Sequence, residues 1–154
     1  MCIRDRLKSL GELNDTSLFF TSPNADKGSD IILDRILNAV KENKDNYFYI
    51  PSLGQDLYLN ALLLFDYIVG NSSSGVIEAP LLNKKVINIG SRQSGRYRFG
   101  RVIDVDNDYE SIFNAIYNID KFHQIEEYDF REFKKNYITK SPSKKIIKFL
   151  KSML

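Results

Sequence analysis

Short apolar runs alternate with amphipathic segments along most of the chain. The runs are the length of buried strands, and they lie at residues 17–21, 47–50, 67–69, 86–89 and 102–105. The segments between them place apolar residues at helical spacing, at residues 29–43, 56–65 and 108–119. Leu7, Leu10 and Leu13 fit the tail of a further helix. Strands that alternate with helices predict an α/β fold, a Rossmann-like doubly wound parallel sheet with helices on both faces.

Nearly all the unusual residue chemistry lies in loops that follow the predicted strands. In such a sheet the ligand binds beyond the carboxyl ends of the strands. The loops at those ends are residues 22–26, 51–55, 70–75 and 90–101. Their coincidence with polar, glycine and arginine residues predicts a binding site along that edge.

The most informative loop is the turn Gly70-Asn71-Ser72-Ser73-Ser74-Gly75, after which a short helix is expected to begin. Backbone N–H groups and the helix dipole make such a turn suitable for a phosphate. Glu78 follows about one helical turn later, where its carboxylate can accept hydrogen bonds from a ribose. Together they predict a nucleoside diphosphate site. The alternatives are an ordinary serine-capped connection and a first-turn acid that favours the helix dipole.

Other loop residues have two readings each. Asn24 either approaches a ligand or caps the next helix, and for Asp26 we expect the capping role. Among the loop arginines we expect Arg92 to be functional, leave Arg96 open, and assign the other two to the surface or to a domain interface: Arg98 and Arg101. Gly95 and Gly100 suggest a mobile loop that suits a lid.

Composition narrows the classes of function. The chain has 154 residues, enough for one domain with a core, and a net charge of +2 that gives no argument for nucleic acid. With Cys2 and His123 as the sole cysteine and histidine, we expect no disulfide, no metal site and no cofactor. We expect no membrane segment, because no apolar run approaches 20 residues, and a cytoplasmic location, because no apolar segment of a signal peptide follows the charged start.

Five motifs in order resemble a known family. They are residues 23–26, 52–55, 70–75, 78–80 and 87–96. Together they look like the carboxyl-terminal half of UDP-N-acetylglucosamine 2-epimerases, with the hydrolysing branch that feeds sialic-acid synthesis as the best match. The resemblance spans roughly Leu18 to Asp120. It implies the second domain of a GT-B type enzyme, in which two Rossmann-like domains face each other across a cleft.

The resemblance also implies roles in binding a UDP-sugar. The diphosphate would lie on Ser72 and Ser73 and on the N–H groups around Ser74 and Gly75, and Glu78 would bind the ribose. Three further residues would approach the diphosphate or sugar, read the uracil through the backbone, and add charge, respectively: Asn24, Leu53 and Arg92.

Family chemistry is proton abstraction at C2 and anti elimination of UDP to a 2-acetamidoglucal, followed by addition of water to give N-acetylmannosamine. The resemblance places the acid and base carboxylates on the first domain, and a histidine at a junction that would precede Leu7. We therefore expect no catalytic residue in this chain, a missing N-terminal domain as partner, and no activity alone. His123 reads as a surface residue. The sequence leaves open which UDP-sugar is bound, and it leaves open the oligomeric state, including a homo-oligomer.

The expected organisation has three parts. Residues 1–6 are either an assembly artefact or a frayed terminus, residues 7–140 form the UDP-binding domain, and residues 141–154 form an amphipathic helix. That helix would pack toward the missing domain, with a membrane surface as the alternative. Two other functions remain: a GT-B glycosyltransferase domain, against which residues 88–93 argue, and a non-catalytic nucleotide-binding module, which requires Met1 to be the true start.

Overall fold

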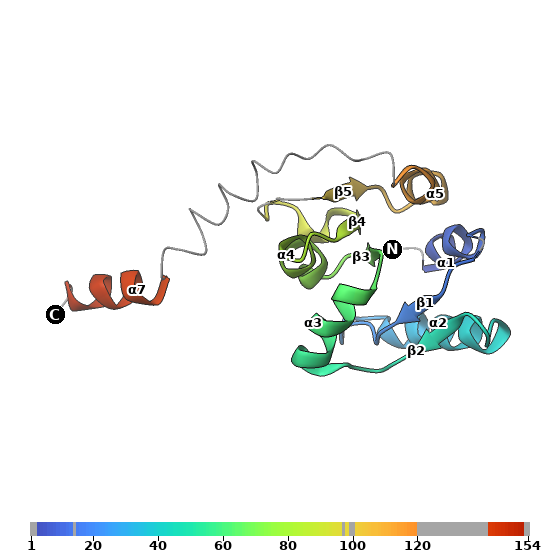
Figure 1. Cartoon of the computed structure of the whole chain (residues 1–154), viewed down its shortest axis with the longest axis horizontal. Coiled ribbons are helices and arrows are strands. Elements are labelled where there is room, and N and C mark those ends of the chain that lie inside the picture. Colours follow the sequence, from blue (N-terminus) through green and yellow to red (C-terminus); the bar gives the residue numbers. More distant parts are fainter. Residues whose placement is uncertain (1–2, 14, 97, 99–100, 120–141, 153–154) are drawn as a thin grey trace.

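Parallel strands alternate with helices in the computed structural model, which describes residues 3–13, 15–96, 98, 101–119 and 142–152 (Figure 1). This confirms the predicted α/β class. The elements in chain order are α1 (Ile3–Gly11), β1 (Leu18–Phe20), α2 (Ser29–Glu42), β2 (Tyr47–Tyr49), α3 (Gly54–Leu64), β3 (Tyr67–Gly70), α4 (Ser73–Leu81), β4 (Lys85–Ile89), the short 3-10 helix η1 (Ser91–Gln93), β5 (Val102–Val105), α5 (Tyr109–Asn118) and α7 (Pro142–Lys151).

The strands form two parallel sheets where the sequence pattern predicts one. β1 pairs with β2, and β3, β4 and β5 pair in that order. In register, Leu18 lies opposite Tyr47, and Val69 opposite Ile87. The two sheets are neighbours, because Leu18 and Val69 pack against the same buried cluster. No hydrogen bonds join β1 to β3 in a ladder among the described residues, so the sheet is interrupted between them.

Two apolar clusters cover the opposite faces of the three-stranded sheet. One joins α1 and α5 to the sheet through Leu10, Ile87, Ile89, Ile112 and Ile116. The other packs α3 and α4 on the sheet through Leu62, Ala79 and Val86. Val86 of β4 lies in one cluster and the next residue, Ile87, lies in the other, because successive side chains of a strand point to opposite faces of the sheet. Helix α1 also contacts α2, so these two helices and α5 share one face.

Helix α1 begins earlier than the pattern indicates. Residues 3–6, expected to belong to an irregular terminus, are helical, and the reason is burial: Ile3 is 7% exposed. Ser9 fixes the same helix to α5, because its hydroxyl is buried and donates to the Asp5 and Tyr109 carbonyls at 2.8 and 3.2 Å.

Helix α5 begins where its sequence predicts. Asp108 is the N-cap, and its carboxylate accepts a hydrogen bond from the Ser111 N–H at 2.8 Å. This backbone hydrogen bond is the main reason that the pKa of Asp108 lies below its ordinary value. His123 and the rest of residues 120–141 lie outside the described residues. Where the chain is described, no helix has the length and apolarity needed to span a membrane.

Candidate functional site

The candidate site lies at the carboxyl edge of the parallel strands. There the turn after β3 leads directly into α4, which begins at Ser73, so Ser74 and Gly75 belong to its first turn. Ser72 is the N-cap with extended backbone, yet its side chain makes no capping hydrogen bond. The serine-capped connection considered as the alternative is therefore not the arrangement found. The first N–H groups of α4 have no partner within the helix, as in any helix start.

Gly75 allows α4 to lie close to the sheet. The residue is buried, and a Cβ at this position would stand 3.6 Å from the side chains of Ile68 on β3 and Val86 on β4. That is ordinary van der Waals contact, so the helix rests directly on both strands. The close packing fixes the height at which the helix terminus stands above the sheet edge.

Glu78 is held beside the helix start by Ser74, which in turn contacts Tyr58. The Ser74 hydroxyl donates to the Glu78 carboxylate at 2.6 Å, and it lies 2.7 Å from the Tyr58 hydroxyl of α3. Burial is the first reason that the pKa of Tyr58 lies above its ordinary value; the bond to Ser74 opposes the shift and the Glu78 charge adds to it. The Ser74 side chain therefore orients Glu78, while its N–H remains part of the helix terminus.

Arg92 draws the loop after β1 toward the loop after β4. Its guanidinium lies 3.1 Å from the Asp26 carboxylate. With the Asn24 amide oriented so that its oxygen faces the guanidinium, that oxygen accepts two hydrogen bonds at 2.9 and 3.0 Å. The structure thus brings Asn24 and Arg92 together. The capping role expected for Asp26 is wrong, because Gly28 is the N-cap of α2 and Asp26 faces Arg92 instead.

Gln93 ties η1 to the turn after β3. Its side chain is 3% exposed, and its amide nitrogen donates to the Asn71 carbonyl at 2.7 Å. The amide oxygen of Gln93 has no partner among the described residues. Gln93 lies within the motif of residues 87–96, but no role of its own was predicted for it, because its contact joins loops that follow two different strands.

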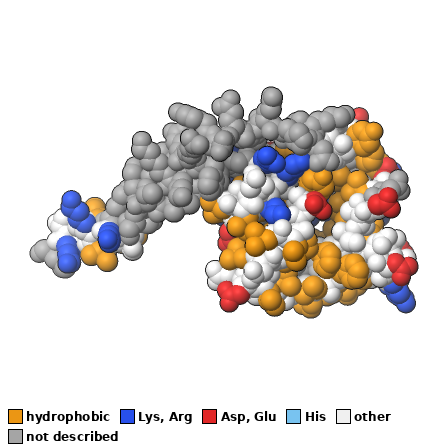
Figure 2. All heavy atoms as spheres, in the orientation of Figure 1, with side chains coloured by type: hydrophobic (Ala, Val, Ile, Leu, Met, Phe, Trp, Pro, Cys, Tyr) orange, Lys and Arg blue, Asp and Glu red, His pale blue; other side chains and the backbone are white. Residues whose placement is uncertain are grey.

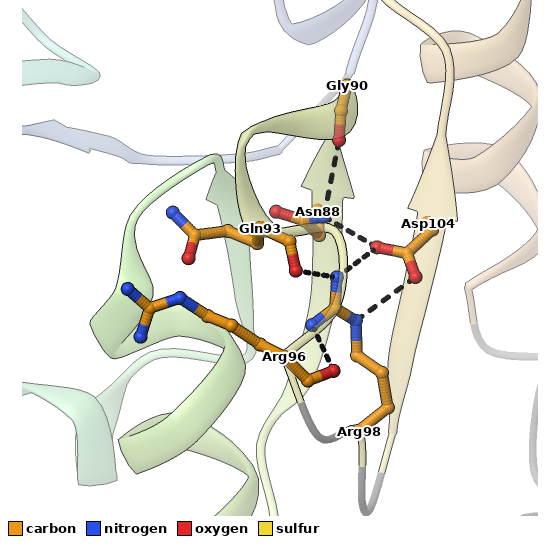
Figure 3. A network of polar contacts seen from close by, with 6 residues as sticks. All are labelled: Asn88, Gly90, Gln93, Arg96, Arg98 and Asp104. Atoms are coloured by element: carbon orange, nitrogen blue, oxygen red, sulfur yellow. Dashed lines mark hydrogen bonds and ion pairs between the residues drawn. The ribbon is translucent and has the colours of Figure 1, made fainter.

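Arg98, which the sequence assigns to the surface or to a domain interface, is half-buried and has a structural role that the sequence did not indicate. Figure 3 shows its guanidinium between the Gln93 carbonyl and the Asp104 carboxylate, at 2.8 and 3.1 Å. It also donates to the Arg96 carbonyl at 3.2 Å, whereas the Arg96 side chain points away from the network. Arg98 thereby anchors the loop after β4 to β5. Arg92, in the same loop, is directed the other way, toward Asp26 in the loop after β1.

Asn88 completes this anchor from within β4. It is 1% exposed and its amide nitrogen donates to Asp104 at 2.5 Å. Partial burial would raise the pKa of the Asp104 carboxyl, but the hydrogen bonds from Arg98 and Asn88 and the Arg98 charge outweigh it, so the pKa lies below its ordinary value. Gly90 permits the turn that follows: its φ is +75°, and a Cβ there would lie 2.7 Å from the Asn107 amide.

Leu53 lies in a loop that carries none of the other candidate residues. It is the half-buried N-cap of α3, in the loop after β2, and the neighbouring Ser52 hydroxyl accepts from the Gly54 N–H at 3.2 Å. Helix α3 links this loop to the site through the Tyr58–Ser74 contact one turn later. In the part of the chain that the structure describes, no cluster of three metal-ligating side chains is present.

The fold and the candidate site together define a Rossmann-like α/β domain with a helix terminus, a carboxylate held by a serine, and an arginine at the carboxyl edge of the strands. The chain belongs to the UDP-N-acetylglucosamine 2-epimerase family, whose model matches residues 2–151.

Curated relatives agree with this family. The chain is 34% identical over 135 residues to the GDP/UDP-N,N'-diacetylbacillosamine 2-epimerase (hydrolyzing) of Campylobacter jejuni, covering 87% of this chain and 32% of the relative. It is 41% identical over 103 residues to polysialic acid biosynthesis protein P7 of Escherichia coli, covering 67% and 26%. It is 35% identical over 105 residues to the UDP-N-acetylglucosamine 2-epimerase of Neisseria meningitidis, covering 68% and 27%. The chain thus spans about a third or less of the length of these relatives.

Proposed function

We propose that this chain is the UDP-sugar-binding half of a hydrolysing UDP-N-acetylglucosamine 2-epimerase. The diphosphate lies on Ser72, Ser73 and the first N–H groups of α4, and the ribose hydroxyls donate to Glu78. The observation that carries the proposal is the orientation of Glu78 by Ser74 beside a helix terminus whose N-cap side chain does not cap the helix. Such a terminus attracts an anion, and a carboxylate beside it accepts from neutral hydroxyls.

Arg92 supports the anionic end of the ligand in this proposal. It is 42% exposed and pairs with Asp26, which is itself 66% exposed. An exposed pair of this kind is weak, worth about 0–1 kcal/mol. The guanidinium can therefore exchange Asp26 for a phosphate oxygen at little cost. Asn24 lies within the same group, and the backbone near Leu53 reads the uracil.

The reaction belongs to the longer polypeptide in this proposal. Elimination of UDP and hydration of the 2-acetamidoglucal need acid and base groups, which we assign to the other domain, so the chain alone binds and does not turn over. The Campylobacter jejuni relative carries the name of a diacetylbacillosamine 2-epimerase, so the sugar is either N-acetylglucosamine or that diacetamido form. Assay of the longer polypeptide with both UDP-sugars, following release of UDP, distinguishes the two.

Titration calorimetry with UDP tests the binding site in the chain itself. Saturable binding is expected at millimolar UDP or below, in a sample whose circular dichroism shows a folded protein. Glu78→Ala should weaken UDP but leave inorganic pyrophosphate unchanged, because pyrophosphate has no ribose. A folded chain with no saturable heat would contradict the site, and an equal loss for pyrophosphate would contradict the ribose role of Glu78.

A further inference from the structure

Gln93 is buried where the loop after β4 meets the turn after β3. It is 3% exposed, and its side-chain amide donates to the Asn71 carbonyl at 2.7 Å. Its amide oxygen has no partner among the described residues. A buried amide oxygen without a hydrogen bond costs free energy of folding, whereas an apolar side chain of similar length carries no such cost. Stability alone therefore gives little reason for a glutamine at this position.

The hydrogen bond from Gln93 fixes the direction of one peptide group, which joins Asn71 to Ser72. In a planar trans peptide the C=O and the N–H point in opposite directions. Because the Asn71 carbonyl is directed toward the Gln93 amide, the Ser72 N–H is directed away from it. Ser72 is the N-cap of α4, so its N–H is one of the first donors of the helix start, which have no partner within the helix.

The direction of this peptide group decides which charge the helix start presents. Asn71 and Ser72 lie between the end of β3 at Gly70 and the start of α4 at Ser73. A half-turn of their peptide would exchange the N–H for the carbonyl oxygen and bring a partial negative charge to a place that otherwise attracts anions. The hydrogen bond from Gln93 opposes that half-turn.

Gln93 can hold the turn because its own backbone is anchored from the other side. Arg98 donates to the Gln93 carbonyl at 2.8 Å and to the Asp104 carboxylate at 3.1 Å. In Figure 3 the Gln93 carbonyl faces the Arg98 guanidinium, and the Gln93 side chain points away from this network. A continuous series of hydrogen bonds therefore connects β5, through Arg98 and Gln93, to the turn after β3.

We propose that Gln93 is a positioning residue for the diphosphate, which acts through the peptide between Asn71 and Ser72 without touching the ligand. The proposal rests on the proposed function, in which the diphosphate lies at the start of α4. Gln93 and Arg92 both belong to η1, so the same hydrogen bond also sets the spacing between the turn and the loop that carries Arg92.

The charge on the surface agrees with an anionic ligand on this side of the domain. Figure 2 shows hydrophobic side chains gathered over the region that Figure 1 assigns to α3 and the two-stranded sheet, whereas Lys and Arg side chains lie over the region of β4 and β5. Clustered basic side chains raise the local concentration of anions. The proposed role of Gln93 is to give the N–H groups at this side one fixed arrangement.

Titration calorimetry with inorganic pyrophosphate and with UDP tests the proposal on Gln93→Met, which keeps the length of the side chain and removes the donor. Both affinities should fall alike, by about fivefold to tenfold, because the variant weakens a hydrogen bond to a charged ligand. The urea midpoint should change little. The variant removes the unpartnered amide oxygen together with the donor, and the half-buried Asn71 can accept from water instead. Ser94→Ala, the matched control at an exposed residue of the same loop, should change neither quantity.

The outcomes separate this proposal from the proposed function. Unchanged pyrophosphate affinity in Gln93→Met would overturn the positioning role and leave the UDP site intact, as would a loss confined to UDP, the pattern expected for Glu78→Ala. A urea midpoint that falls together with the affinity would indicate a structural role and would also overturn it. A folded parent chain that binds neither pyrophosphate nor UDP would contradict the proposed function itself.

Nuclear magnetic resonance of the parent chain supplies a test that requires no variant. A scalar coupling across the hydrogen bond between the Gln93 amide and the Asn71 carbonyl should persist at saturating pyrophosphate, and the Ser72 amide proton should shift on binding. Loss of the coupling on binding would mean that Gln93 releases the turn, and it would overturn the proposal. A Ser72 amide that does not respond to bound pyrophosphate would do the same.

Discussion

Replacing Ser74 by alanine tests whether this serine holds Glu78 in the position that we propose for binding the ribose. The variant loses the 2.6 Å hydrogen bond to the Glu78 carboxylate and the 2.7 Å contact with Tyr58. A hydrogen bond to a charged group contributes about 1.5–3 kcal/mol. Both side chains here are half-buried, so water partly replaces the lost bond. We therefore expect about 1 kcal/mol, which corresponds to about a fivefold loss of UDP affinity.

The assay is titration calorimetry with UDP and with pyrophosphate on Ser74→Ala, Glu78→Ala and the double variant. Because Ser74 acts through Glu78, its replacement should change UDP affinity less than twofold when Glu78 is already absent. Pyrophosphate affinity should stay unchanged in both single variants. Ser73→Ala is the matched control, since an exposed serine that binds the diphosphate should lose UDP and pyrophosphate alike.

Two results would refute this reasoning. An equal loss of pyrophosphate and UDP in Ser74→Ala would mean that the serine side chain itself contacts the diphosphate. Additive losses in the double variant would mean that Ser74 and Glu78 act independently, contrary to the contact between them. Urea unfolding of each variant identifies any part of the effect that comes from the Tyr58 hydroxyl left without its partner.

Two further predictions concern the anchor of the loop after β4. Gly90→Ala should lower the free energy of unfolding in urea by about 1–3 kcal/mol, because the Gly90 backbone (φ +75°, ψ −172°) is one that L side chains rarely adopt, whereas the Asn107 amide at 2.7 Å from the new Cβ can rotate away. Gly95→Ala, at φ +77° with nothing within 4 Å, should cost about 1 kcal/mol, and a Gly90→Ala cost no larger than this would contradict the backbone argument. Asp104→Asn should cost under 1 kcal/mol at neutral pH, since the carboxylate is 54% exposed. Because the pKa of Asp104 is lowered, its contribution is present above the ordinary value of 3.8 and is lost as the pH falls through the lowered value. The stability difference between Asp104→Asn and the parent should therefore vanish in acid, and a difference that persists there would exclude the charge as its cause.

The elements of the fold were predictable because they depend on local periodicity. The apolar run at residues 67–69 and the helical spacing in residues 108–119 appear where expected, within a residue or two. The turn after β3 was equally visible, because its glycine and serine residues stand together in the sequence. These features depend on neighbouring residues alone, so they can be predicted without knowing how the rest of the chain folds.

Features that depend on distant pairing were not predictable. Arg98 reads as a surface arginine until β5 brings the Asp104 carboxylate to it, and Asp26 reads as a helix cap until Arg92 arrives from the loop after β4. The division into two sheets is of the same kind. Each strand has an ordinary composition, so the division into two sheets is revealed only by the absence of a ladder between β1 and β3 in the described structure.

This division bears directly on the site. Asn24 belongs to the two-stranded sheet, whereas Ser72, Glu78 and Arg92 belong to the three-stranded one. The direct contact between the two groups is the exposed cluster around Arg92, and exposed ion pairs contribute about 0–1 kcal/mol. Such a contact is too weak to hold two sheets in register at a binding edge. The spacing between the two groups is therefore set by packing between the sheets, where Leu18 and Val69 lie against the same buried cluster.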